Sequence, residues 1–458
     1  MDKKILNKLS RINWEFPKEN TQYLTHSFHQ YPARFIPQIP KVLIENLTKK
    51  EDTVLDPFCG CGTTLVESQL NERNAIGIDL NPLACLISKV KTTPLDEQKL
   101  VDLWKSLKVE INNEIMKSKN SSLVSFLNQK MDYDDRNKIN LEIVLPNRRK
   151  SAKFTEEITK EILIIRDTIN DISDKEFRDF LNIGLSATIY SCFDSRSKKF
   201  DFWRTFERRI EHMSNLIINY NNSQLTKTSY KPEVRIFNDD ARRYPEEISR
   251  ESVDLVITSP TYVNVFDYYR IHIYNLIFLE LEYENFRQKE MGAHRRHKEN
   301  RFRLLTEYLA DMYRAIQEMN KATKTNGHIC IIIGDSCIEF ERIHTHKHFI
   351  TLGKSLGLNH LRTITRNIDP VSKYANRAIG NIEREHVLVF KTTDQKRDLT
   401  KKLMISKINS ILEEYEKHIK TSKGTCVRKN VMLTKERLLL NQEKIRKAID
   451  KIPSDINR

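Results

Sequence analysis

The sequence lacks several features that would define other classes of protein. No apolar run approaches the ~20 residues of a membrane-spanning helix, so no membrane contact is expected. The start, Met1-Asp2-Lys3-Lys4, leads into polar sequence without a signal-peptide core, which favours a cytoplasmic, bacterial or nucleoid-associated protein. Seven cysteines are an odd number and form no Cys-x-x-Cys pair, which argues against a disulfide framework and a zinc ribbon.

Positive charge is in excess. The chain has 77 Lys and Arg against 62 Asp and Glu, a formal net charge of +15. Such an excess favours a polyanionic partner, although a lysine-rich composition with solvated side chains explains it equally well. Residues 391–458 hold 18 basic and 9 acidic side chains, so +9 of the total lies in this tail. The tail either contacts nucleic acid or is a solvated helical appendage.

Short apolar runs typical of strands alternate with helical patterns. This order predicts an α/β fold with a doubly wound, mostly parallel sheet. A long helical block interrupts it, and a basic helical tail follows it. The expected strands are 53–55, 75–78, 253–257, 329–333 and 387–390. We expect a catalytic domain in two parts, residues 1–94 and 232–394. The insertion between them is 95–231, and the tail is 395–458.

A glycine turn follows the first expected strand. Asp56 ends that strand, and Gly60 and Gly62, two of only eleven glycines, precede an expected helix. No lysine follows as in a Walker loop, and Asp56 would repel a pyrophosphate but could pair with an ammonium group. Asp79 ends the next strand, where a carboxylate can accept ribose hydroxyls. The arrangement predicts S-adenosylmethionine as cofactor; no metal is expected, and Cys59 and Cys61 are read as small packing residues.

A second loop, Thr258-Ser259-Pro260-Thr261-Tyr262, follows the strand 253–257. An exocyclic base amine is a poor nucleophile because its lone pair is delocalised into the ring. A serine hydroxyl and the carbonyl of a proline can accept its N–H bonds, and an aromatic side chain can stack on a base taken out of the helix. Ser259, Pro260 and Tyr262 are therefore the candidate catalytic residues.

These two loops resemble motifs I and IV of amino-group DNA methyltransferases. The segments 29–37, 238–242 and 385–390 are similar to that family's cofactor segment, motif III and final strand. The resemblance implies a Rossmann-like methyltransferase fold that places Asp56, Gly60 and Gly62 at the methionine part of the cofactor. It also implies Asp79 at the ribose, Asp240 at the adenine amino group and Phe35 near the methionine end.

The same resemblance implies base flipping and methylation of cytosine N4 in double-stranded DNA. Motif IV is usually Ser-Pro-Pro-Tyr in cytosine-N4 enzymes and Asp/Asn-Pro-Pro-Tyr in most adenine-N6 enzymes, so Ser259 favours cytosine. A separately encoded restriction endonuclease is a candidate partner. The alternatives are an adenine-N6 enzyme, an RNA base-amine methyltransferase and a non-catalytic DNA-binding subunit; Thr261, where the family has a second proline, is the only support for the last.

Other basic and histidine-rich stretches have weaker signals. The insertion 95–231 is the candidate target-recognition region. Tyr262, Arg270, Arg295 and Arg296 are the candidate nucleic-acid contacts. His344, His346 and His348 alternate, and without an acidic neighbour in the sequence we expect them in an exposed polar loop rather than at a metal.

Overall fold

The computed structural model describes most of the chain. The described residues are 2–120, 122–123, 125–126, 154–195, 199–225, 230–293, 296–339, 341–368, 384–421 and 435–455. None of the helices within these ranges is long and apolar enough to cross a membrane.

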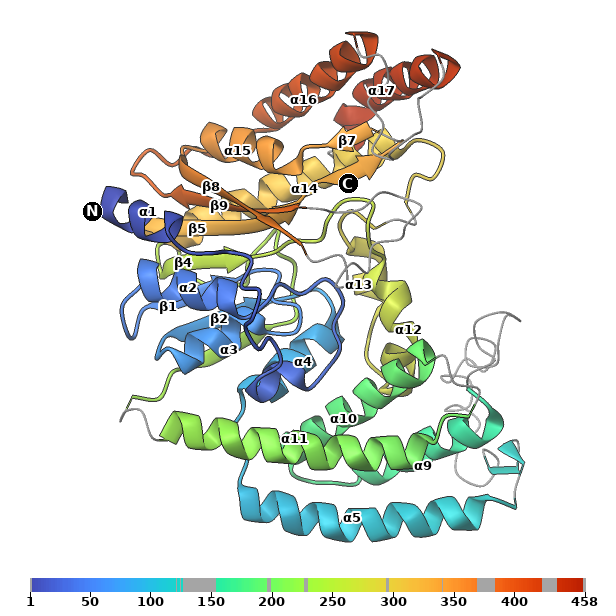
Figure 1. Cartoon of the computed structure of the whole chain (residues 1–458). Helices are drawn as coiled ribbons and strands as arrows, with labels where there is room; N and C mark the ends of the chain where they lie inside the picture. The colour runs from blue at the N-terminus through green and yellow to red at the C-terminus, as the bar shows by residue number, and fades with distance from the viewer. Residues whose placement is uncertain are drawn as a thin grey trace.

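A seven-stranded sheet forms the centre of the molecule (Figure 1). Its order is β3-β2-β1-β4-β5-β9-β8, and all neighbours are parallel except that β9 runs antiparallel to both β5 and β8. A two-stranded hairpin of β6 and β7 lies beyond β5. The strands are β1 (Thr53–Asp56), β2 (Asn74–Ile78), β3 (Val234–Phe237), β4 (Val253–Thr258), β5 (Thr323–Gly334), β6 (Ser336–Ile338), β7 (Glu341–Ile343), β8 (Asn359–Asn367) and β9 (Arg384–Lys391).

Helices cover both faces of the sheet because its central strands are apolar on both faces. Along β5, Ile329, Ile331 and Ile333 pack toward α14 and α15, whereas Cys330 and Ile332 pack toward α1 and α2. The helices of this part are α1 (Asp2–Ser10), η1 (Leu24–Ser27), α2 (Gln38–Leu47), α3 (Thr63–Leu70), α4 (Pro82–Thr92), α12 (Tyr268–Phe278), α13 (Glu284–Lys289), α14 (Arg301–Ala322) and α15 (Thr345–Ser355). The predicted α/β, mostly parallel fold is confirmed.

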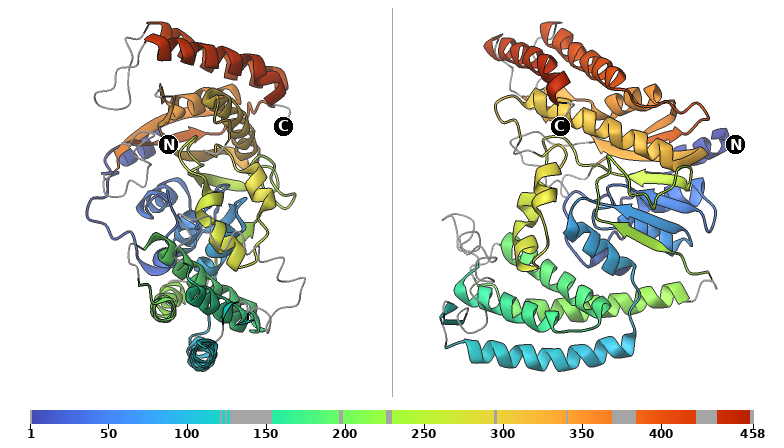
Figure 2. Two further views of the ribbon diagram at one scale, coloured as in Figure 1. Left: turned by 90° about the vertical axis from the view of Figure 1, so that its right-hand side faces the viewer. Right: turned by 180° about the vertical axis from the view of Figure 1, so that it is seen from behind.

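Four long helices form a separate layer on one side of the sheet, below it in Figure 1 and also visible in Figure 2. They are α5 (Glu97–Ser118), α9 (Glu156–Asn170), α10 (Lys175–Asp194) and α11 (Phe202–Leu225). Isoleucines spaced three and four residues apart on α9 are buried in the shared core of these helices. The layer joins the part that contains the sheet through α4 and α12, which contact α10, and through η1, which contacts α11.

The basic tail is not a solvated appendage. Its helices α16 (Lys401–Thr421) and α17 (Lys435–Asp455) pack on each other and on α14. Buried apolar residues such as Ile408, Leu412 and Ile445 continue the core that lies between α14 and the sheet. The reason is the amphipathic pattern of both helices, whose charged side chains occupy the opposite, exposed faces.

Candidate active site

The turn between β1 and α3 requires its two glycines. Gly60 and Gly62 have φ angles of +50° and +75°, in the left-handed region that glycine adopts without steric cost. A Cβ atom on Gly62 would also lie 2.8 Å from the Ser88 hydroxyl oxygen. The turn therefore brings the backbone of Gly60 to the wall of a pocket, while Gly62 begins α3 behind it.

Asp56 joins this turn to the second loop. Its Oδ1 accepts hydrogen bonds from the Thr258 hydroxyl (2.7 Å) and the Phe58 N–H (3.1 Å), and its Oδ2 accepts one from the Thr64 hydroxyl (2.6 Å). Burial raises the pKa of Asp56 to about 6, and these hydrogen bonds oppose the rise. Asp56 is not among the residues that line the pocket, so its contact with the methionine part of a cofactor stays a prediction.

Asp79 does line the pocket. It accepts hydrogen bonds from the backbone N–H groups of Gly60 and Asn81, each at 2.8 Å. Burial raises the pKa of its carboxyl group to about 6. Because each carboxylate oxygen has two lone pairs, both oxygens retain an acceptor site. Two hydroxyl groups of a ribose are the kind of donors that such a carboxylate can take.

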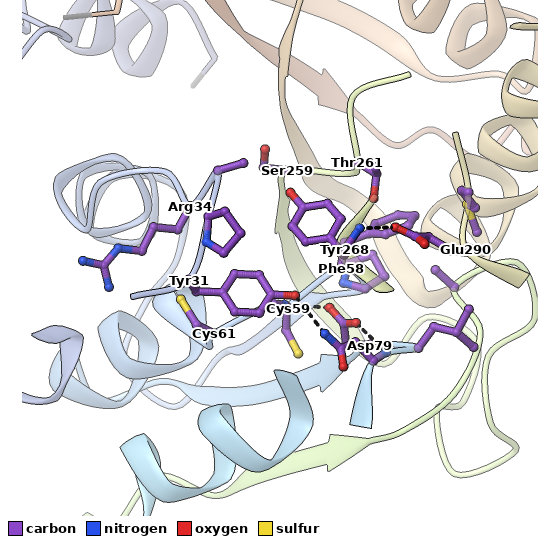
Figure 3. Close-up of a pocket in the computed structure, with 18 of the residues that line it drawn as sticks. Tyr31, Arg34, Phe58, Cys59, Cys61, Asp79, Ser259, Thr261, Tyr268 and Glu290 are labelled. Carbon is purple, nitrogen blue, oxygen red and sulfur yellow. Dashed lines mark hydrogen bonds between the residues drawn. The ribbon is translucent and has the colours of Figure 1, made fainter. Parts of the chain in front are cut away.

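The pocket unites residues from distant parts of the sequence (Figure 3). Of the predicted site residues, Phe35, Gly60, Asp79, Asp240 and Ser259 line it. They come from the segment before α2, the glycine turn, and the loops after β2, β3 and β4. All three of these strands end at the same edge of the sheet, where parallel α/β proteins bind ligands. The two expected loops thus share one cavity.

The loop after β4 divides between the pocket and the core. Ser259 and Thr261 line the pocket, whereas Pro260 and Tyr262 do not. Tyr262 is 8% exposed, and its hydroxyl donates to Glu385 Oε1 at 3.0 Å. Burial and the nearby Glu385 carboxylate raise the pKa of Tyr262 well above its usual range. Tyr262 is therefore held by β9, and its stacking on a target base stays a prediction.

Asp240 is held by an arginine. Its Oδ1 accepts hydrogen bonds from the backbone N–H and Nε of Arg242, and its Oδ2 accepts one at 2.6 Å from the same guanidinium group. Burial acts to raise the pKa of Asp240, but the hydrogen bonds and charge of Arg242 hold it below its usual value. Arg242 also pairs with Asp311 on α14. Asp240 is thus an ionised acceptor in a fixed position at the wall of the pocket.

Tyr31, Tyr268 and Glu290 also line the pocket, although they were not among the predicted site residues. Tyr31 and Tyr268 stack with ring centroids 5.8 Å apart, and Glu290 accepts a hydrogen bond from the Tyr268 N–H at 2.6 Å. Figure 3 shows both rings inside the pocket. Tyr31 belongs to the segment 29–37 that carries the family resemblance, and Tyr268 follows the loop after β4 in the sequence. Glu290 belongs to no recognisable motif: it lies in the loop after α13, where no pattern in the sequence marks it as a pocket residue.

Two of the predicted nucleic-acid contacts, Arg270 and Arg296, do not line the pocket. Arg270, on α12, is 62% exposed and pairs with Asp267 at 3.5 Å. Arg296 is 32% exposed and pairs with Glu307 at 3.5 Å. Arg295 lies outside the described residues. The two described arginines are accessible to a polyanion, so their assignment to DNA stays a prediction.

The expectation that the alternating histidines lie in an exposed polar loop is wrong. His344, His346 and His348 lie at the start of α15, and an acidic partner reaches them from the end of β5: Asp335 contacts His344 and His346. His348 is buried and hydrogen-bonds the Tyr415 hydroxyl. This contact could not be predicted from the sequence, because the β6–β7 hairpin lies between Asp335 and the histidines along the chain. By contrast, Cys59 and Cys61 are buried, as expected of packing residues, and both also line the pocket.

The sheet order and the pocket at its carboxyl edge are those of a doubly wound α/β protein, in which small ligands bind at the carboxyl ends of the strands. Residues 3–90 and 253–448 match the DNA methylase family of the N6/N4 type. The match covers more than half of the chain and includes both loops of the pocket. The chain belongs to this family.

Named relatives agree with this assignment. The Type II methyltransferase M.MvaI of Kocuria varians is 29% identical over 286 residues, which cover 57% of this chain and 59% of that protein. The Type II methyltransferase M.BsoBI of Geobacillus stearothermophilus is 23% identical over 314 residues, 65% of this chain and 60% of that protein. The chain spans about three fifths of the length of these relatives.

A solved S-adenosylmethionine-dependent methyltransferase from Methanosarcina mazei covers 77% of this chain, and this chain covers 97% of it, at 10% identity and a TM-score of 0.30. Family membership makes S-adenosylmethionine the cofactor of this chain, and the pocket fits it. Asp79 offers acceptors for the ribose, and the backbone of Gly60 admits close approach. Gly62 gives α3 no side-chain cap, and Thr63, the first residue of that helix, lines the pocket, so a carboxylate of the cofactor would lie at the amino end of α3.

Proposed function

We propose that this chain transfers a methyl group from S-adenosylmethionine to the exocyclic N4 amine of cytosine in double-stranded DNA. The observation that carries the proposal is the shared pocket: Ser259 lines the same cavity as Gly60 and Asp79. A cofactor held by the glycine turn and Asp79 would therefore lie beside a target held by Ser259. DNA as the substrate is supported by the family match and by the net charge of +15.

Different residues of the pocket would bind different parts of the cofactor. Asp79 would hold the ribose and Asp240 the adenine amino group, while Phe35 would pack near the methionine end. When bound, S-adenosylmethionine would supply an electrophilic methyl carbon: the amine nitrogen would bond to this carbon as the carbon–sulfur bond breaks, S-adenosylhomocysteine would leave, and the amine would release one proton to water. Placing the two reactants side by side in this way supplies most of the rate enhancement in such a reaction.

The second loop would activate the target amine. The Ser259 hydroxyl and the Pro260 carbonyl would accept its N–H bonds, which draws the nitrogen lone pair out of conjugation with the ring. Tyr262 would contact the face of a base flipped out of the duplex. In the present geometry Tyr262 is bound to Glu385, so a conformational adjustment of this side chain accompanies base binding in our proposal.

We prefer cytosine to adenine as the target base because Ser259 occupies the position at which most adenine-N6 enzymes of this family have Asp or Asn. A serine hydroxyl is neutral, whereas an aspartate would add a further carboxylate to the pocket that Asp79 and Asp240 line. Adenine N6 is the alternative, since its amine poses the same chemical problem. The insertion helices α5 and α9–α11 are the proposed target-recognition region, and a restriction endonuclease is the proposed partner.

The test is to incubate the purified chain with S-adenosylmethionine and duplex DNA of mixed sequence, digest the DNA and identify the modified nucleoside by mass spectrometry. N4-methylcytosine is the expected product. N6-methyladenine would reject the cytosine assignment but keep the amine chemistry. Bulk tRNA is the parallel substrate, and methylation of tRNA alone would reject DNA as the target. A mock purification from the same host without this chain is the control for contaminating methyltransferases.

A further inference from the structure

A cluster of three histidines and one carboxylate lies beside β9 and is not used by the proposed reaction. Asp335 directly follows β5, His344 is the N-cap of α15, His346 lies in the first turn of that helix, and His386 is the third residue of β9. These four residues therefore come from three separate elements. In the part of the chain that the structure describes, Asp335, His344 and His346 are the only group whose donor atoms all lie within metal-binding reach of one another.

The donor atoms are separated by distances that suit a shared ion. His346 Nδ1 lies 2.8 Å from Asp335 Oδ1, and His344 Nδ1 lies 3.0 Å from Asp335 Oδ2. His386 Nε2 lies 3.9 Å from Asp335 Oδ1. Metal–ligand distances of about 2.1 Å in a tetrahedral site place donor atoms about 3.4 Å apart. The three observed distances to the Asp335 carboxylate lie on either side of that value, so shifts of about half an ångström would bring these donor pairs to it.

The surroundings of the cluster also suit a bound ion. The side chains of Asp335, His346 and His386 are 22%, 14% and 9% exposed, whereas that of His344 is 40% exposed and leaves a route from solvent. The rings of His346 and His386 stack at 3.9 Å, which fixes their relative position. His386 Nδ1 hydrogen-bonds the Thr365 hydroxyl at 3.0 Å, a contact that leaves Nε2 facing Asp335. Outer hydrogen bonds of this kind orient metal-binding histidines.

We propose that Asp335, His344, His346 and His386 bind one divalent first-row transition ion, with zinc as the best match. Imidazole and carboxylate are ligands that Zn²⁺ accepts in tetrahedral geometry, and the absence of a thiolate sets the site apart from zinc ribbons. Mg²⁺ and Ca²⁺ are disfavoured because they prefer oxygen ligands.

The ion would have a structural role. It would join the end of β5, the start of α15 and β9 at one point. His386 directly follows Glu385, the residue that accepts a hydrogen bond from the Tyr262 hydroxyl. A metal at this point would therefore hold β9 where it supports the loop after β4, without contact between the ion and the reacting atoms.

Cobalt binding to the full chain tests the proposal. After treatment with a chelator, the protein is titrated with Co²⁺ and its visible absorption is followed; Zn²⁺ is then added in competition. We expect one equivalent of Co²⁺ to give the intense visible bands of tetrahedral coordination, without a thiolate charge-transfer band, and Zn²⁺ to abolish them. Zn²⁺ should also raise the Tm of the wild-type chain.

Two ligand variants and one matched control complete the design. Changes to residues that only support the ligands of a metal lower its affinity by about 10- to 100-fold. His346→Asn removes a ligand itself and should lower the metal affinity by more than that. His344→Gln is the second variant, since its more exposed side chain makes misfolding a smaller concern. His360→Asn removes a histidine on β8 outside the cluster and should bind as wild type does. Unchanged metal affinity in both ligand variants, a thiolate band, or no binding by the wild type would each overturn the proposal.

Discussion

Thr258 donates a hydrogen bond from its hydroxyl to Oδ1 of Asp56 over 2.7 Å, and this contact joins the last residues of β4 and β1. The two residues are 202 positions apart in the sequence, and both are buried. The bond fixes the point from which the glycine turn and the Ser259 loop leave the sheet. The shared pocket therefore depends on a buried carboxylate as well as on the pairing of β1 with β4.

Replacing Thr258 by valine tests that dependence. Valine has nearly the same shape but no donor, so Asp56 loses one of its three hydrogen bonds while buried. We expect a loss of about 1–3 kcal/mol in the free energy of unfolding, measured in urea at neutral pH. Thr258→Ser keeps the hydroxyl and should lose less. Equal stability of the valine variant and the wild type would mean that this bond does not stabilise the fold.

The cofactor affinity should depend on pH through Asp79. Burial raises the pKa of this carboxyl group to about 6, so it is ionised above pH 6 and protonated below. The ionised form is the better acceptor for hydroxyl groups, and binding is therefore expected to weaken as the pH falls through about 6. Calorimetric titration with S-adenosylhomocysteine over this range measures the effect.

Asp56 complicates that measurement because its pKa is also raised to about 6. The variants separate the two groups. Asp79→Asn should bind more weakly at neutral pH and lose most of the pH dependence, whereas Asp56→Asn should keep the contribution of Asp79. A pH dependence that survives in Asp79→Asn but vanishes in Asp56→Asn would reassign the effect to Asp56.

Ser259→Ala should separate cofactor binding from transfer. The hydroxyl lines the pocket, and alanine removes it without adding bulk. We expect unchanged affinity for S-adenosylhomocysteine and a kcat lower by roughly 10- to 100-fold, the size of one lost hydrogen bond to a group that becomes charged. Single-turnover methylation of duplex DNA provides the rate. A variant with wild-type kcat would show that Ser259 does not hold the amine.

Tyr262 requires two variants because it contributes both a ring and a hydroxyl. Tyr262→Phe removes the hydrogen bond to Glu385 but keeps the ring, so stacking predicts a rate close to that of the wild type. Tyr262→Ala removes the ring and should reduce the rate strongly. Since Tyr262 is 8% exposed, the alanine variant also loses about 3–5 kcal/mol of stability, and its rate is measured only where circular dichroism shows it folded. Equal rates for the alanine variant and the wild type would exclude stacking.

The sequence revealed the strands with strong local patterns. The apolar runs of β1, β2, β4, β5 and β9 identified these strands, because each is buried on both faces. The edge strands β3 and β8 were missed: every residue of β3 is only partly buried, and β8 (Asn359–Asn367) is rich in polar and charged side chains. The antiparallel direction of β9 also escaped prediction, since a short apolar run is the same in either direction.

The site was predictable where one segment carries the chemistry. Gly60, Asp79 and Ser259 lie in compact motifs, and the structure places all three at the pocket. The contacts that hold these motifs were not predictable, because they join distant segments. Glu385 reaches Tyr262 across 123 positions, and Glu290 enters the pocket from a loop without a pattern. Asp335 reaches the histidines of α15 only because a hairpin folds between them.

Arg270 should contribute to DNA binding as a phosphate contact. Its side chain is 62% exposed on α12, the helix whose first residue, Tyr268, lines the pocket. Arg270→Ala should therefore weaken binding to duplexes of any sequence and reduce the slope of log K against log salt by about 1. Fluorescence anisotropy at several salt concentrations measures both. Lys50→Ala is the matched control: this lysine is 65% exposed and precedes β1, at the opposite edge of the sheet. An equal loss of affinity in both variants would mean that Arg270 acts only through the overall charge.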